Sequence, residues 1–121
     1  MEYLLLANES PEDYAARDDP ERAEAYWAGW TGYLAALSDA GVLRGAGGLH
    51  PPSSATTLRL REGQRLLQDG PFAETKEQLG GYFVLDLPDL DAALEWAGRC
   101  PSATTGSVEV RPQLAMPPAG R

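Results

Sequence analysis

The side chain best suited to proton transfer in this sequence is its only histidine, His50. An imidazole titrates near neutral pH, so it can accept or release a proton there. His50 ends one strand-like segment before Pro51-Pro52, and Asp69 ends another before Gly70-Pro71. Because loops at strand ends commonly carry functional residues, His50 and Asp69 could line one cavity as a catalytic acid/base pair. The alternative is a surface or pocket-lining His50 that moves no proton.

The long loop that follows Asp69 supplies the other charged candidates. Glycines bracket residues 69–81, and a loop of this length inside a compact domain is more often functional than not. We expect Phe72 to anchor the loop on the core. Lys76, the only lysine, could pair with Glu74 or Asp69 and so lock the loop or meet an anionic ligand. The alternative is a solvated connector whose exposed ion pairs each contribute under about 1 kcal/mol. The predicted ligand-binding or loop-organising residues are Phe72, Glu74, Lys76 and Glu77.

The sequence holds no cofactor motif. One histidine, one cysteine and scattered carboxylates make a poor transition-metal site. Gly45-Ala46-Gly47 resembles the start of a dinucleotide fingerprint, but His50 stands where the third glycine would be. Pro51-Pro52 then follows in place of a helix. We therefore expect neither a metal nor another cofactor.

Composition excludes several classes of partner. A chain of 121 residues forms one domain with one core. Its net charge of −8 opposes binding to nucleic acid, which needs a positive surface. The longest apolar run, residues 3–7, is too short to cross a membrane, and no signal peptide is expected. Cys100 is the only cysteine, so no disulfide framework is expected and the cytoplasm is the expected compartment.

Hydrophobic periodicity defines the elements that must position these residues. The long helix carries an aromatic stripe that includes Trp27 and Trp30; core packing is its simplest role, and stacking on a ligand is the alternative. In the hairpin, alternation places Leu58 and Leu60 inward. In the first half we predict a strand over 2–7, a short helical turn from Ser10-Pro11, and a long helix that has Asp19 as N-cap and Pro20 in its first turn and stops at Gly41. A strand over 42–50 and a hairpin over 56–68 follow. In the second half we predict a strand over 81–87, a helix over 90–99, a strand over 107–111 and a frayed tail over 113–121.

Without the hairpin, this order is the βαββαβ pattern of ferredoxin-like proteins. Right-handed crossovers would place both helices on one face of the sheet. The strands over 2–7 and 81–87 are nevertheless apolar on both sides, so the face without helices would expose leucine and aromatic side chains. A second copy stacked sheet to sheet would cover that face. The alternative is a monomer whose hairpin folds over it.

The loop sequence carries a resemblance to a known family. Asp69-Gly70-Pro71-Phe72, with the residues up to Gly81, resembles the signature of the DGPF-domain proteins of the YCII-related superfamily. The resemblance extends to residues 48–52, 94–97 and 108–112. It implies a single domain over residues 1–112 with an α+β fold: ferredoxin-like βαββαβ with an inserted β-hairpin, of the dimeric α+β barrel type. The wider group is suspected of using a His–Asp pair; Asp69 matches the motif, whereas His50 lies outside it.

Three functions follow from these observations. The first is a small-molecule-binding or accessory protein, and the resemblance to proteins encoded beside extracytoplasmic-function sigma factors implies a regulatory role. The second is a small acid/base enzyme, for elimination or isomerisation, that uses His50 and Asp69. The third is a purely structural interaction domain. The expected partners are a second copy of the chain and a small-molecule ligand.

Overall fold

Four antiparallel strands in the order β2-β5-β1-β6 form the main sheet of the computed structural model, which describes residues 1–115. The strands are β1 (Glu2–Glu9), β2 (Leu43–Gly48), β5 (Gln78–Asp86) and β6 (Ser107–Pro112). The helices are α1 (Pro11–Ala16), α2 (Ala23–Asp39) and α3 (Leu90–Arg99), with short 3-10 turns η1 (Pro52–Ser54) and η2 (Pro101–Ala103). Strands β3 (Thr56–Arg61) and β4 (Gln64–Asp69) form the separate hairpin. Most of the predicted tail, residues 116–121, lies outside the described part.

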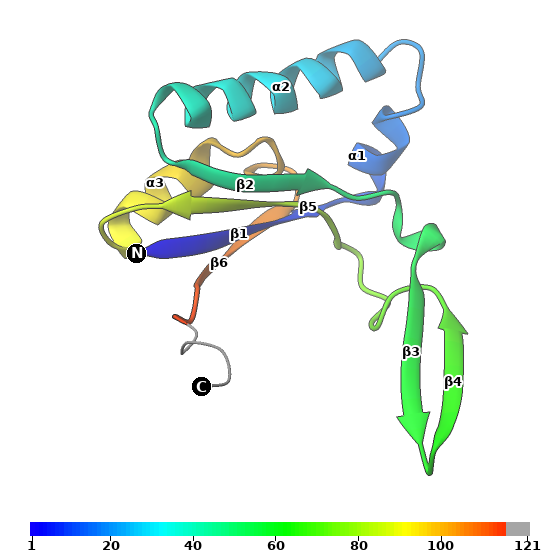
Figure 1. Ribbon diagram of the computed structural model, residues 1–121. Coiled ribbons are helices and arrows are strands. Elements are labelled where there is room, and N and C mark those ends of the chain that lie inside the picture. Colours follow the sequence, from blue (N-terminus) through cyan, green and yellow to red (C-terminus); the bar gives the residue numbers. More distant parts are fainter. Residues whose placement is uncertain (116–121) are drawn as a thin grey trace.

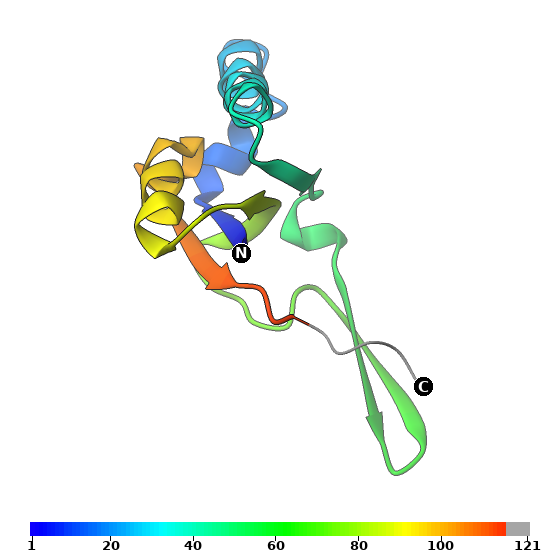
Figure 2. The same ribbon diagram turned by 60° about the vertical axis from the view of Figure 1, so that its left-hand side comes forward.

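Helices α2 and α3 cover one face of the sheet and leave the other bare (Figure 1). The hairpin extends away from the helices, on the side of the bare face (Figures 1 and 2). The predicted ferredoxin-like α+β fold with an inserted hairpin is therefore confirmed. The alternative in which the hairpin folds over the bare face does not match this arrangement.

The core lies between the helices and the covered face of the sheet. Every second residue of β1 is buried, from Tyr3 through Leu5 and Ala7. The same alternation continues to Glu9, whose side chain is only 1% exposed. Period-2 geometry thus carries a carboxylate into the interior at the end of a hydrophobic strand.

A β-bulge makes room for that carboxylate. Ala7 pairs with Gly81 and Asn8 pairs with Leu79, so Gly80 is the additional residue on β5. A Cβ atom at Gly80 would lie 1.8 Å from Oε2 of Glu9. Only glycine therefore allows β5 to pass over Glu9. The bulge also explains why β5 begins at Gln78 and not at the predicted Gly81, because pairing with β1 continues through it.

Local signals placed most helix ends correctly. Ser10 caps α1 with a reciprocal capping box to Asp13, and α3 covers the predicted residues 90–99. The predicted start of the long helix at Pro20 was wrong. The Asp19 carboxylate accepts hydrogen bonds from the backbone N–H of Glu21 and from Nε of Arg22, which holds residues 20–22 in a turn. Helix α2 therefore begins at Ala23.

The hairpin is formed as predicted, but its leucines are not buried. Leu58 is 52% exposed and Leu60 is 62% exposed, so their predicted inward placement was wrong. The alternation is present, but within residues 1–115 no helix or further strand lies against either side of the hairpin (Figure 1). On the bare sheet face, Leu4, Leu6 and Val84 are half-buried and Tyr82 is 36% exposed.

Candidate functional site

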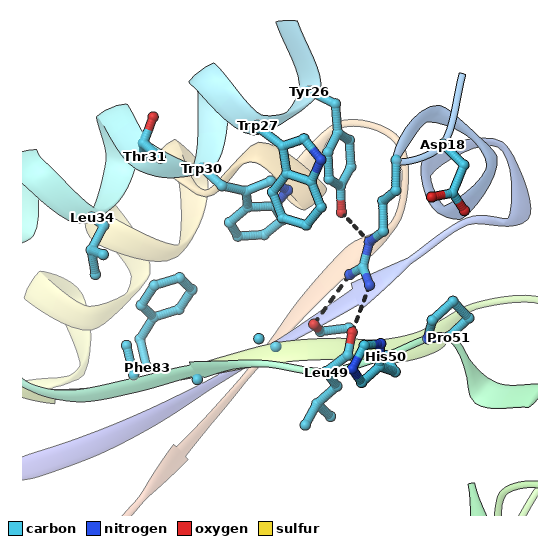
Figure 3. A pocket seen from close by; sticks show the side chains of 16 residues that line it. Asp18, Tyr26, Trp27, Trp30, Thr31, Leu34, Leu49, His50, Pro51 and Phe83 are labelled. Atoms are coloured by element: carbon cyan, nitrogen blue, oxygen red, sulfur yellow. Dashed lines mark hydrogen bonds between the residues drawn. The ribbon is translucent and has the colours of Figure 1, made fainter. Parts of the chain in front are cut away.

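A cavity of about 700 Å³ lies between α2 and the β2–β5 side of the sheet (Figure 3). Its apolar wall consists of Trp27, Trp30 and Leu34 on α2, with Phe83 opposite on β5. Its floor is mainly the glycine-rich backbone of β2 and β5. Polar side chains gather at the end formed by α1 and by the segment after β2.

Aromatic packing sets the height of this cavity. The ring of Trp30 stacks on Phe83 with centroids 6.0 Å apart and planes 11° apart. Tyr33 meets the same ring edge-on at 5.2 Å. Rings of this size hold α2 away from the sheet, and the Trp27 side chain beside them remains half-exposed. The predicted core role of the stripe is confirmed for Trp30, and its stacking on a ligand stays a prediction, although Trp30 also lines the cavity.

The polar end is organised by a buried network of Glu9, Arg17 and Tyr26. Nη2 of Arg17 lies 2.6 Å from Oε2 of Glu9, and Nε of Arg17 donates to the Tyr26 hydroxyl at 2.9 Å. The Tyr26 hydroxyl donates in turn to Oε1 of Glu9. Both carboxylate oxygens therefore have partners, as a buried charge requires.

The same guanidinium holds the backbone around the cavity. Arg17 donates from Nη1 to the carbonyl of Leu49 and from Nη2 to the carbonyl of Gly80, the latter at 3.3 Å (Figure 3). Leu49 directly precedes His50, so the network fixes the segment that carries the histidine. Tyr14 adds a hydrogen bond from its hydroxyl to the carbonyl of Gln78.

Two tyrosines and Arg17 at this end of the cavity have raised pKa values. Burial, then the hydrogen bond to Glu9, raises the pKa of Tyr26 to about 12. Burial by itself would lower the pKa of Arg17, but the hydrogen bond to Tyr26 and the charge of Glu9 outweigh it and raise that pKa. Burial, then the charge of Glu9, raises the pKa of Tyr14 to about 12. Tyr14, Arg17 and Tyr26 therefore keep their protons near pH 7 and serve as hydrogen-bond donors that support the cavity.

The structure places the two predicted catalytic residues in different cavities. His50 is exposed and lines the aromatic cavity, where its ring is visible in Figure 3. Asp69 lines a second cavity of about 460 Å³. Among the hydrogen bonds of residues 1–115, none joins the two side chains. Their action as a pair stays a prediction.

The second cavity contains part of the charged loop. Glu74 and Thr75 line it together with Asp69. Glu77 lies to one side and accepts a hydrogen bond of 2.6 Å from the Ser107 hydroxyl, which ties the loop to β6. The Lys76 side chain is exposed, and no ion pair involving it is found in the described part of the chain.

Phe72 does not anchor the loop on the core. Its side chain is 79% exposed, and the guanidinium of Arg59 on the hairpin lies 5.6 Å from the ring centroid. The predicted anchor was therefore wrong. The ring lies beside the hairpin because the loop leaves β4 in that direction and reaches the sheet only at Gln78.

Sequence reasoning missed Glu9, Arg17 and Tyr26 as site residues. One usable signal was present: Glu9 follows Tyr3, Leu5 and Ala7 in strict alternation, and a carboxylate in phase with a buried face needs a cation. The local sequence does not identify Arg17 as that cation, since the pairing depends on how α1 packs against the sheet.

The fold and this site define a small ferredoxin-like α+β protein with an aromatic cavity beneath one helix. Residues 1–116 match the family described as "YCII-related domain", and the chain therefore belongs to the YCII-related family. A relative from Rhizobium meliloti (strain 1021), named "Uncharacterized protein R00369", is 45% identical over 82 residues, which is 66% of this chain and 66% of that protein. The chain thus matches just under two thirds of that relative's length.

A solved structure shares the fold at low sequence identity. It is the 5-chloro-2-hydroxyhydroquinone dehydrochlorinase TftG from Burkholderia phenoliruptrix AC1100, in complex with 2,5-dihydroxybenzoquinone. The two chains are 15% identical with a TM-score of 0.54, and 94% of each is covered. This likeness establishes the fold alone.

Within residues 1–115, no group of three or more histidine, cysteine, aspartate or glutamate side chains is placed to hold a metal ion. No helix in that same part is long and apolar enough to span a membrane.

Proposed function

We propose that this protein binds a small, planar, largely apolar molecule in the cavity between α2 and the sheet. The observation that carries the proposal is that Trp27, Trp30 and Phe83 together line a cavity of about 700 Å³, in which Trp30 stacks on Phe83. This volume lies within the usual range of small-molecule sites, and aromatic walls favour a flat ring.

The polar end limits what the ligand can carry. Both oxygens of Glu9 and the hydroxyl of Tyr26 are already hydrogen-bonded within the network. The imidazole of His50 and the carboxylate of Asp18 line the cavity outside that network and can bind a polar substituent. We therefore expect a ring with one or two oxygen substituents and no large charged group. The ligand in the TftG title is a planar oxygenated ring, which is compatible with this expectation but does not carry it at 15% identity.

Tryptophan fluorescence tests the proposal directly. Hydroquinone and 2,5-dihydroxybenzoquinone serve as planar probes, and cyclohexane-1,4-diol is the saturated counterpart of hydroquinone. We expect the planar probes to change the emission and the saturated one to have no effect. Trp27→Leu should weaken binding at least tenfold, whereas Trp96→Phe, outside the cavity, should leave it unchanged. Equal responses to the planar and saturated probes would contradict the proposal.

The alternative function is acid/base catalysis, for elimination or isomerisation, with His50 as the catalytic group. The observation in its favour is that the only imidazole of the chain lines the aromatic cavity. Asp69 remains its proposed partner, and the loop residues Glu74, Lys76 and Glu77 remain proposed ligand-binding or loop-organising residues.

An NMR titration of the His50 imidazole, repeated in Asp69→Asn, tests that alternative. A pKa displaced from about 6.5 that returns in the variant would support the pair. An imidazole that titrates normally and ignores the substitution would remove Asp69 from the site.

We also propose that the protein is a homodimer in which the bare sheet faces stack. The half-buried Leu4, Leu6 and Val84 on that face support this, since monomers rarely leave such patches in water. Leu6→Asp should shift the protein to monomer in analytical ultracentrifugation, and a wild-type protein that sediments as a monomer at all concentrations would contradict the dimer.

A cytoplasmic location and an association with a sigma factor are further proposals, which rest on composition and on the family resemblance.

A further inference from the structure

The hairpin of β3 and β4 has two unlike faces. Opposite residues of an antiparallel pair share a face, so Leu58 and Leu67 lie together, next to the pair of Leu60 and Arg65. We call these four residues the leucine face. Leu58 is 52% exposed, Leu60 is 62% exposed and Leu67 is 61% exposed.

The other face is already engaged within the chain. There, Arg59 donates to the Gln68 side chain at 3.0 Å and lies over the ring of Phe72. Arg65, by contrast, makes no ion pair or side-chain hydrogen bond within residues 1–115. The side that lacks internal partners is therefore the side with three leucines and a free cation.

Two hydrogen bonds at its base hold the two strands of the hairpin together. The N–H of Gly70 donates to the carbonyl of Ala55 at 2.7 Å, and the Thr57 hydroxyl donates to the carbonyl of Gly70 at 2.9 Å. Two six-residue strands extend about 20 Å from this base. The arm reaches past the bare sheet face on the side away from the helices (Figures 1 and 2).

Charge indicates what could cover the leucine face. Three arginines against Glu62 and Asp69 give residues 56–69 a charge of +1, so the rest of the chain, whose total is −8, carries −9. A second copy therefore presents a strongly acidic body to the arm, and the charged residues on the side of the leucine face are Arg65 and, at the base, Asp69. On the bare sheet face, Glu2 has no ion pair within residues 1–115, whereas Glu109 is already paired with Arg111 at 3.6 Å. Apolar and electrostatic complementarity thus both favour the chain itself as the partner.

We propose that the leucine face of each arm docks on a second copy of this chain and extends the interface between the bare sheet faces. The inference rests on the proposed homodimer. Leu58, Leu60 and Leu67 pack against apolar side chains of the partner subunit, and Arg65 meets its acidic surface. In such a dimer the two arms would bury the apolar surface of their leucine faces, which a single chain leaves exposed to water.

Analytical ultracentrifugation of matched variants tests the arms separately from the sheets. We expect Leu58→Ser/Leu67→Ser to raise the dimer dissociation constant at least tenfold, and Leu66→Ser, on the other face with 48% exposure, to leave it within twofold. Arg65→Glu should weaken the dimer, and added salt should change its dissociation constant in the opposite direction to wild type. Arg61→Glu, on the opposite face, should have little effect.

The outcomes separate this inference from the dimer itself. A dimer that dissociates in Leu6→Asp but is unaffected by Leu58→Ser/Leu67→Ser and by Arg65→Glu would overturn the arm contact and keep the sheet contact. A wild-type monomer at all concentrations would overturn both. Circular dichroism spectra that match the wild type would confirm that the variants fold, and Arg65→Glu provides the test if the double leucine variant does not.

Discussion

The end of β1 and the β3–β4 arm differ in what they bury and what they expose. At the end of β1, the molecule buries a carboxylate, Glu9, and supplies both of its oxygens with partners from its own chain. On the leucine face of the arm it exposes Leu58, Leu60 and Leu67, and no layer of residues 1–115 covers them. A satisfied buried charge is complete within one subunit, whereas an exposed apolar face calls for something outside it. The first region is therefore read as support for the cavity and the second as a contact surface.

The largest effect should come from breaking the buried ion pair. Arg17→Met leaves Glu9 charged and buried without its cation, so unfolding free energy in urea should fall by about 3–5 kcal/mol. Glu9→Gln added to Arg17→Met should recover much of that loss, since no charge remains buried. Arg22→Met, which removes an exposed pair, should cost under about 1 kcal/mol. Equal costs for Arg17→Met and Arg22→Met would show that burial of the pair is not what matters.

The glycine bulge should have the next largest effect. A methyl group at Gly80 would overlap the Glu9 carboxylate, so Gly80→Ala should cost about 1–3 kcal/mol in the same assay. Gly48→Ala is the matched control, because nothing lies within 4 Å of a Cβ atom there. A Gly80→Ala protein as stable as Gly48→Ala would mean that Glu9 can readily move aside.

Alkaline pH should lower the stability of the protein through the same region, by less than these substitutions do. The pKa values of Tyr14 and Tyr26 are about 12 in the folded protein, above the ordinary 10.0. A raised folded pKa contributes stability that is fully present below pH 10 and is lost as pH rises through about 12. Stability measured in urea should therefore decline from pH 10 upward, and less so in Tyr26→Phe. Absorbance of tyrosinate at an ordinary pKa for both residues would contradict this expectation.

The arm should show the smallest effect on the stability of a single chain. Leu58→Ser changes a half-exposed side chain, so unfolding measured at the lowest usable protein concentration should shift by no more than about 0.5 kcal/mol. Leu5→Ala, at a fully buried position, should cost about 2–5 kcal/mol. A large loss in Leu58→Ser under dilute conditions would place the arm in contact with its own subunit.

Local sequence rules were sufficient where an element depends on its own residues. Ser10-Pro11 predicted the start of α1, Gly41 predicted the end of α2, and residues 90–99 predicted α3. The same rules failed at Asp19, where a side chain caps a turn and not a helix. They also failed at Phe72, because exposure depends on what lies opposite a residue and not on its type.

The site was predicted less well than the fold, because its geometry depends on contacts between residues that are distant in the sequence. His50 was predicted to end a strand over 42–50, but β2 ends at Gly48 and His50 lies two residues beyond it, on the wall of a cavity. The cavity itself arises between α2 and β5, through rings that are 53 residues apart in Trp30 and Phe83. No local pattern connects them.

The sequence by itself determined the order of strands and helices, the hairpin, the bare sheet face and the family, because periodicity, capping and a contiguous motif are local properties. Only the tertiary structure decided that Glu9 is buried against Arg17, that Gly80 passes over it, and that His50 and Asp69 line separate cavities. Those outcomes depend on contacts between residues distant in sequence, such as Arg17 and the Gly80 carbonyl, 63 residues apart. Chain folding brings them together, and their side-chain types alone do not specify which of many possible partners they meet.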